Sequence, residues 1–309
     1  MHMQEMILIG DNILHNRSYL RGVERYVVPG DSEPLVLSEA VLRVQDADAV
    51  RDFFTHDRED LDTKHLQVVS NPTDEIAFNR SCPHLVSVFA YGEGLKLAYS
   101  IRSIFDKSLQ LTEVCLSSTS ITRELLSDLQ GLIEAKRLTR LHIDGHGVTF
   151  HEPGLDWTGL FNAGRKILQV CKIGLFRMED ATVDAAVNCT ALTHLDISAD
   201  QMSDQQFVDL LNNNNGLRTI TLVGLNNLTN RALEAVIKLG YNLTRIELGS
   251  HRFNDADFHE VSKAVFERSA HTHWVRLFNY QREVTVVRQN ACDRFRRRDQ
   301  PATHMLPYF

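Results

Sequence analysis

The 309-residue sequence has few cysteines and no long apolar run near its N-terminus. The first shortage argues against a disulfide-stabilised secreted protein, and the second argues against a membrane-targeting segment. Its five cysteines make an odd number and form no CxxC pair, which is typical of a reduced intracellular chain. The apolar run at residues 6–9 is short and flanked by Glu5 and Asp11, so we expect neither a signal peptide nor a transmembrane segment. The sequence therefore predicts a cytoplasmic protein, with nuclear or cytoskeletal and ciliary association as open alternatives.

Several motifs of enzyme active sites are also absent. The chain contains no Gly-rich phosphate loop, no GxSxG and no HExxH. Its formal net charge of −7 disfavours nucleic-acid binding, because contacts with phosphates need a basic surface. We therefore predict a protein that is not an enzyme and uses no cofactor or catalytic metal, and we keep RNA binding as a weaker alternative.

One short pattern is present three times between residues 192 and 270. Each copy has apolar residues at positions 1, 4 and 6, which is the spacing of a short strand with one side facing a core. A helix-capping residue and an apolar stripe at helical spacing follow in each copy. The copies begin at Leu192, Leu217 and Leu243. Their fourth positions, which we expect to point into the core, are Leu195, Ile220 and Ile246.

The same pattern continues upstream. Further strands are predicted to start at residues 85, 111, 138 and 168, which gives intervals similar to those between the three clear copies. No single strand–turn–helix unit could bury its own apolar side, so the units must stack. The sequence therefore predicts an α/β solenoid with a curved parallel inner sheet and outer helices.

These units resemble leucine-rich repeats, and the most similar subtype is the cysteine-containing, F-box-associated one, related to the ribonuclease-inhibitor-like branch. The resemblance covers residues 85–270 and includes turns such as Ile121-Thr122 before a helix. The subtype's cysteine at position nine is replaced, for example by His146 and His251. The resemblance implies protein binding, for example in ubiquitin ligases, in GTPase activation or in structural assemblies such as cilia. Residues 1–45 contain no recognisable F-box.

The predicted organisation has four parts. They are an N-terminal cap with degenerate repeats (1–84), the repeat array (85–270), C-terminal capping strands (271–287) and an extended basic tail (288–309). Outside the clear repeats we expect strands at 42–44, 66–69, 274–278 and 283–287, and helices at 46–54 and 96–107.

The candidate partner-binding residues lie at strand positions 3 and 5, which point away from the core onto the concave surface. They are Arg140, His142, Lys172, His194, Asp196, Thr219, Thr221, Arg245 and Glu247. This mixed polar surface suits a protein partner better than a phosphate backbone. We expect the charges to be exposed, so that reversing Asp196 and Glu247 weakens binding and spares stability.

Two groups of residues have side chains that could bind a metal or act in catalysis. His142, Asp144 and His146 alternate on one side of a strand and could bind zinc, but same-side residues are about 7 Å apart and Lys172 on the next strand would repel a cation. Cys115 should lie beside His142, but no third residue is evident to orient such a pair. We therefore predict neither a metal site nor a catalytic thiol.

Two further segments have open interpretations. The basic residues Arg294, Arg296, Arg297 and Arg298 form a solvated tail, a docking segment for an acidic partner, or a nuclear-import or RNA-contacting patch. The insertion HEPGLDWTG contains Trp157, which either packs against the neighbouring helix or contacts a partner.

Overall fold

The computed structural model divides the chain into two compact units, Met1–Leu155 and Asp156–Phe309. It describes residues 25–26, 35–36, 41–44, 65–69, 83–91, 102, 104–105, 107–117, 121–144, 155–174, 178–198, 202–223, 227–288 and 296–301. At 25–26, 35–36, 41–44, 65, 67–69, 91, 117, 144, 255 and 296–301, only the backbone is described. The predicted helix at 46–54 lies outside these residues.

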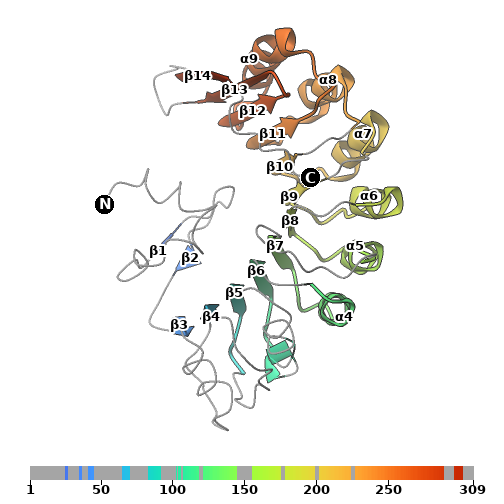
Figure 1. Cartoon of the computed structure of the whole chain (residues 1–309), viewed down its shortest axis with the longest axis vertical. Helices are drawn as coiled ribbons and strands as arrows, with labels where there is room; N and C mark the ends of the chain where they lie inside the picture. Colours follow the sequence, from blue (N-terminus) through green and yellow to red (C-terminus); the bar gives the residue numbers. More distant parts are fainter. Residues whose placement is uncertain are drawn as a thin grey trace. The chain divides into compact units, whose positions relative to one another are not determined.

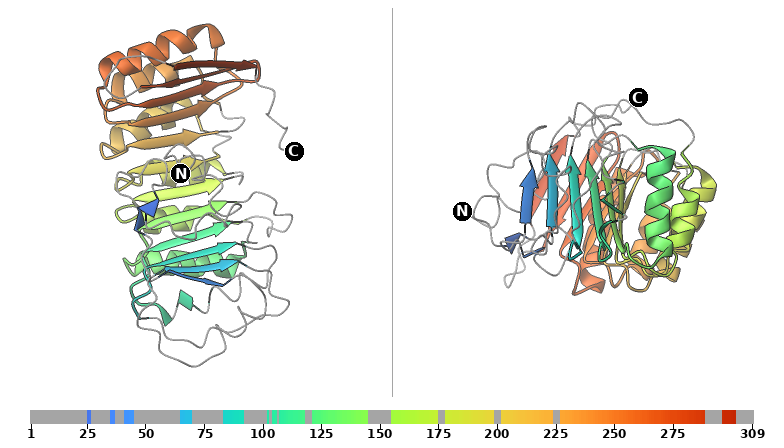
Figure 2. Two further views of the ribbon diagram at one scale, coloured as in Figure 1. Left: turned by 90° about the vertical axis from the view of Figure 1, so that its left-hand side faces the viewer. Right: turned by 90° about the horizontal axis from the view of Figure 1, so that it is seen from below.

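The first unit contains a parallel sheet, and one short antiparallel pair of strands precedes that sheet in the sequence. The pair is β1 (Arg25–Tyr26) and β2 (Leu35–Val36). The sheet runs in sequence order through β3 (Val41–Val44), β4 (His65–Val69), β5 (Ser87–Tyr91), β6 (Glu113–Ser117) and β7 (Arg140–Asp144), as Figure 2 shows. The strands predicted at 42–44 and 66–69 are confirmed, and both are parallel to the repeat strands that follow them.

Helix α4 (Arg123–Glu134) packs its apolar stripe into the core of the first unit. Leu125, Leu129 and Ile133 are fully buried there, as the helical spacing requires. The helix begins at Thr122, whose Oγ1 accepts a hydrogen bond from the backbone N–H of Leu125 at 3.1 Å. The turn that the sequence marks before this helix is therefore a true N-cap.

The second unit alternates strands and helices in the same way. Its parallel strands are β8 (Val170–Gly174), β9 (His194–Ile197), β10 (Thr219–Leu222), β11 (Arg245–Gly249) and β12 (Trp274–Phe278). Its helices are α5 (Thr158–Gly164), α6 (Asp180–Val187), α7 (Asp204–Asn213), α8 (Asn230–Leu239) and α9 (Phe258–Arg268), with the short 3₁₀ turn η2 (Asp255–Asp257) before α9. All five helices cover one side of the sheet (Figure 1).

The predicted repeat register is confirmed in the second unit. Leu195, Ile220 and Ile246 occupy directly paired positions on β9, β10 and β11, and Val275 continues the row on β12. All four side chains are fully buried. Cys171 is also buried, in the preceding strand, as its inward position predicts. Strand–helix repeats in this register form the leucine-rich repeat solenoid architecture.

A threonine at the start of many strands links each repeat to the one before it. The hydroxyls of Thr193 and Thr244 each donate to a backbone carbonyl of the preceding repeat at 3.0 Å. Thr112 and Thr139 make the same bond in the first unit at 3.4 Å. The same carbonyls also accept the backbone N–H groups of the threonine and of the residue after it, so the hydroxyl adds a further bond that helps to hold each strand in register.

The helix N-termini of neighbouring repeats are also joined by hydrogen bonds. Ser203 and Gln206 form a capping box at the start of α7. The carboxylate of Asp204, in the first turn of α7, accepts bonds from the backbone N–H and the hydroxyl of Thr229 at 2.8 and 2.6 Å. Thr229 is itself the N-cap of α8, so the first turn of α7 supports the start of α8.

The C-terminal end of the array is closed by antiparallel strands. The strands predicted at 274–278 and 283–287 are confirmed as β12 and β13 (Arg282–Val287). β13 pairs antiparallel with β12, and β14 (Arg296–Pro301), which lies within the predicted basic tail, pairs antiparallel with β13. β13 therefore has a hydrogen-bonded partner strand on each side.

Arg288, directly after β13, holds the end of α9. Its guanidinium donates to the backbone carbonyls of Ser269 at 3.1 Å, of Ala270 at 2.7 Å and of Phe266. Its Cζ also lies 5.2 Å from the centre of the Phe266 ring. A cation at a helix C-terminus satisfies the last carbonyls and interacts favourably with the helix dipole.

The part of the insertion that the structure describes packs inward. Trp157 is 2% exposed, and Phe161 on α5 is fully buried. Of the two interpretations of Trp157, packing against the array is the one realised, because a side chain so deeply buried cannot contact a partner.

We predict that replacing Leu195, Ile220 or Ile246 by Ala costs about 2–5 kcal/mol of unfolding free energy, because each leaves a cavity between two repeats. Urea unfolding followed by circular dichroism measures this loss. Replacing the exposed Lys238 of α8 by Ala is the control and should change stability little. An Ile220→Asp variant as stable as the wild type would contradict the observed register.

Candidate functional site

The face of the second unit's sheet that carries no helices is the candidate site, and we call it the helix-free face. Strand alternation and the pairing register place on it the residues opposite to the core positions. They are Lys172, His194, Asp196, Thr219, Thr221, Arg245, Glu247, Trp274, Arg276, Phe278, Glu283 and Thr285. Seven of these twelve residues are predicted partner-binding residues. The two other predicted residues, Arg140 and His142, lie on β7 of the first unit, which pairs with β6.

Much of this face is buried, contrary to the expectation of an exposed polar surface. Four of its polar side chains are less than 9% exposed: His194 (8%), Thr219 (4%), Thr221 (8%) and Glu247 (7%). Lys172, Asp196 and Arg245 are half-buried. The expectation that Glu247 is an exposed charge is therefore wrong, because side chains on β11 and its neighbours cover it.

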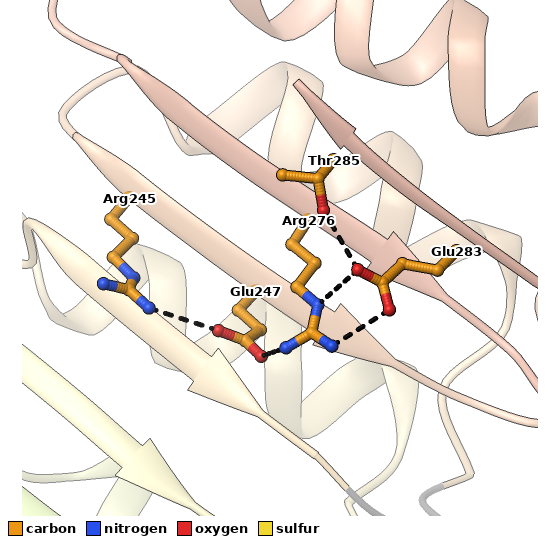
Figure 3. Close-up of polar contacts among 5 residues, drawn as sticks. All are labelled: Arg245, Glu247, Arg276, Glu283 and Thr285. Carbon is orange, nitrogen blue, oxygen red and sulfur yellow. Dashed lines mark hydrogen bonds and ion pairs between the residues drawn. The ribbon is translucent and has the colours of Figure 1, made fainter. Parts of the chain in front are cut away.

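A chain of alternating charges crosses β11, β12 and β13 (Figure 3). Arg276 lies at its centre and donates from Nη1 to Glu247 at 2.7 Å, and from Nε and Nη2 to both carboxylate oxygens of Glu283 at 3.0 Å. Arg245 approaches the other oxygen of Glu247 at 3.5 Å, and the hydroxyl of Thr285 donates to Glu283 at 3.2 Å. The bidentate pair joins the terminal antiparallel strand to the parallel array.

Aromatic rings lie beside these charges. The guanidinium of Arg245 lies 4.2 Å from the centre of the Trp274 ring, and that of Arg276 lies 5.0 Å from the centre of the Phe278 ring. The Phe278 ring lies directly over Gly249, where an added Cβ would be 2.1 Å from Cε2. Gly249 is therefore needed for close ring contact, since any side chain would displace Phe278.

The network also shifts two pKa values. Burial by itself would raise the pKa of Glu283, but the hydrogen bonds and positive charge of Arg276 outweigh it and lower that pKa. Burial would lower the pKa of Arg276, but its bonds to Glu283 and the charges of Glu247 and Glu283 raise it instead. Both shifts favour the ionised pair in the folded state.

The sequence interpretation missed the part of this site that lies on β12 and β13. The sequence predicts residues 274–278 and 283–287 as capping strands, and for Trp274 it favours packing within the cap over contact with a partner. The sequence contained a signal for these residues. Trp274, Arg276 and Phe278 alternate along β12 in the same way as the outward-facing residues of the earlier repeat strands. The pairing of Arg276 with Glu283 depends on the antiparallel turn, which periodicity does not predict.

Two of the residues with side chains suited to chemistry lie on neighbouring strands. Cys115 and His142 occupy paired positions on β6 and β7, but Cys115 is only 5% exposed. The side chain of Asp144 and all of His146 lie outside the described residues. Among the side chains that are described, no group of three His, Cys, Asp or Glu residues could hold a metal ion.

The buried thiols of Cys171 and Cys189 are poorly suited to nucleophilic chemistry. Burial raises the pKa of Cys189 to about 12 and that of Cys171 well above its ordinary value. A thiol with a raised pKa is protonated at neutral pH and therefore a weak nucleophile. Cys115, Cys171 and Cys189 are all free thiols in the described part of the chain.

Of the predicted tail-docking residues, Arg296, Arg297 and Arg298 lie on β14, where the backbone pairs with Val287, Val286 and Thr285. Their side chains are not described, and Arg294 lies outside the described residues. In the described helices, no segment has both the length and the apolarity to cross a membrane.

Comparisons with known proteins relate the chain to a solved structure but to no family model. No protein-family model matches the chain, and no curated protein matches it. A solved structure of an internalin from Listeria monocytogenes is similar over 76% of this chain, with a TM-score of 0.43 and 18% sequence identity. The chain covers 64% of that internalin chain, which is less than two thirds of its length.

We predict that Glu247→Lys destabilises the protein by about 3 kcal/mol or more, because it places a third cation between Arg245 and Arg276 in a buried site. Chemical unfolding measures this change. The control Glu267→Lys, on the exposed side of α9, should stay within about 0.5 kcal/mol of the wild type. Equal stability of the two variants would show that the network contributes nothing to folding.

We also predict that the Glu283–Arg276 pair makes stability depend on pH. Because the folded pKa of Glu283 lies below its unfolded value of about 4.3, its contribution is present above that pH and is lost as the pH falls through the folded pKa. The stability difference between the wild type and Glu283→Gln should therefore shrink in acid, as measured by urea unfolding across a pH series. Glu234→Gln, in an exposed helical pair, is the control. A difference independent of pH would exclude this linkage.

Proposed function

We propose that the chain is a non-catalytic protein-binding scaffold, adaptor or structural subunit of a larger assembly, and that it holds a protein partner on the helix-free face. The observation that supports this proposal most strongly is the half-buried Trp274 with the Arg245 guanidinium 4.2 Å from the ring centre. Trp and Arg are the residue types that most often dominate the binding energy of protein interfaces. Leucine-rich repeat solenoids typically use such sheet surfaces to bind proteins.

The site is held in place before a partner arrives. Arg245 contacts both Trp274 and Glu247, and Glu247 is held in turn by Arg276. A partner therefore meets side chains that have already lost much of their rotamer freedom, and binding costs less entropy. Preorganisation of this kind favours recognition by shape and charge.

The half-buried charges on the neighbouring strands would provide specificity. Lys172 and Asp196 occupy paired positions of opposite sign on β8 and β9. A face with both signs selects partners with the complementary pattern and disfavours others through unpaired charges. Arg140 and His142 in the first unit belong to the same proposal as further partner contacts.

The cellular location belongs to this proposal as well. The three free, buried thiols suit a reducing compartment, and we place the protein in the cytoplasm, with nuclear or ciliary association as variants of the same proposal. The GTPase-activating, ubiquitin-ligase and RNA-binding alternatives have no specific observation in their favour. A GTP-hydrolysis assay and a salt-dependent RNA-binding assay separate two of them from the scaffold.

We predict that Trp274→Ala and Arg245→Glu each weaken partner binding by about 2 kcal/mol or more, because each removes one half of the stacked pair. Partners are identified by affinity purification with mass spectrometry, and their affinities are then measured with purified proteins. The control is Lys263→Glu on the exposed side of α9, where the lysine side chain is 75% exposed. Thermal unfolding of every variant distinguishes lost contacts from lost folding. Unchanged affinity in both folded variants would move the partner site away from this face.

A further inference from the structure

The most exposed aromatic side chain that the structure describes lies in the turn between β12 and β13. Tyr280 is 56% exposed, whereas the other aromatic residues of this strand pair, Trp274 and Phe278, are half-buried and buried. Large exposed aromatic side chains lose little conformational entropy on binding and contribute much contact area, so they are common anchors of protein interfaces. A single exposed aromatic residue is unremarkable by itself, however, and its neighbours decide its role.

His251 lies beside Tyr280, and Arg252 lies beside His251. The ring centres of His251 and Tyr280 are 6.2 Å apart with a tilted geometry, although the residues are far apart in sequence. Arg252 lies next to His251, with 3.3 Å between Nε and the His251 Nε2 atom, and both side chains are exposed. His251, Arg252 and Tyr280 together form a surface at the C-terminal ends of β11 and β12 that we call the strand-end patch.

The backbone beneath the patch is fixed by buried hydrogen bonds on the β12–β13 side. Asn279 donates from Nδ2 to the carbonyl of Phe253 at 3.0 Å. Its Oδ1 accepts from the backbone N–H groups of Gln281 and Arg282, both at 2.8 Å. One buried side chain thus fixes the turn that presents Tyr280 and ties it to the loop after β11.

A second side chain fixes the loop after β11. The hydroxyl of Ser250 donates to the carbonyl of Leu228 in the preceding repeat at 2.7 Å and accepts from the backbone N–H of Arg252 at 3.2 Å. The backbone N–H of Ser250 also donates to the carbonyl of Phe278 at 3.1 Å. Both halves of the patch are therefore held in one arrangement, which lowers the entropic cost of binding.

The charge of Arg252 is not compensated by the side chains that the structure describes. The carboxylate of Asp257 in the same loop instead accepts hydrogen bonds from Asn230 and Asn254. Arg276, by contrast, is paired with two glutamates. An exposed guanidinium without an acidic partner, beside an imidazole that in turn lies next to a phenol ring, is complementary to a carboxylate group flanked by apolar atoms.

We infer that the strand-end patch binds an acidic segment of a protein partner. Arg252 would form the charge-assisted hydrogen bonds to a carboxylate, His251 would add a donor beside it, and Tyr280 would pack against the neighbouring side chains of the segment. This surface is separate from the helix-free face, and it extends the proposed scaffold role by specifying the chemistry of a partner. A single-stranded RNA that stacks on Tyr280 is the competing ligand.

The test uses the full chain and a short fluorescein-labelled peptide of alternating Glu and Phe residues, followed by fluorescence anisotropy at low and high ionic strength. We expect saturable binding that Arg252→Glu and Tyr280→Ala each weaken about tenfold or more. Binding should also weaken at high salt, because the patch is exposed to screening. Tyr241→Ala, which removes another exposed tyrosine, and Lys263→Glu should both bind like the wild type.

A Trp274→Ala variant distinguishes this inference from the proposed function. It should bind the acidic peptide normally even if it loses the partner of the helix-free face. The inference is overturned if the Glu/Phe peptide does not bind saturably, or if the Tyr241 and Lys263 controls lose as much affinity as the patch variants. It is also overturned if an unlabelled oligouridine binds the patch more tightly than the peptide does.

Discussion

Each strand–helix unit of this protein has one apolar side that it cannot bury alone, and the units stack for this reason. Stacking places Leu195, Ile220, Ile246 and Val275 in one continuous buried row across four parallel strands. Because strand side chains alternate, fixing this row also fixes which residues lie on the opposite side of the sheet. The helix-free face is thus a direct consequence of how the core is packed.

A stacked array must also end, and its last strand has no further repeat to pair with. Here the chain reverses, and β13 pairs antiparallel with β12. The reversal brings Glu283 to the Nε and Nη2 atoms of Arg276, whose third guanidinium nitrogen, Nη1, bonds to Glu247 on β11. Burying such charges costs desolvation energy, and each partner would be costly to leave alone. The alternating network therefore favours this one arrangement of the closing strand over a shifted register.

The two proposed binding surfaces differ in how many of their charged side chains already form ion pairs within the protein. On the helix-free face, most charges near β11 to β13 pair with one another, and the Trp274–Arg245 contact is the principal feature available to a partner. In the strand-end patch, Arg252 lacks an ion pair among the described side chains. A repeat protein can separate these tasks, because the sheet ladder carries stability while the loops after each strand vary freely.

Hydrophobic periodicity and capping chemistry are local properties of the chain, so the sequence predicts the repeat phase, the inward positions and the N-caps of α4, α7 and α8. The cap predicted at Asn254 is wrong for α9, which begins after the 3₁₀ turn η2 and has Asp257 as its N-cap. Which side chains meet across strands depends instead on the register between strands in the folded protein. The burial of Glu247 and the contact between His251 and Tyr280 depend on residues about thirty positions apart that register makes neighbours. Periodicity predicts the direction in which a side chain points, whereas its burial depends on the size and charge of the side chains on the adjacent strands.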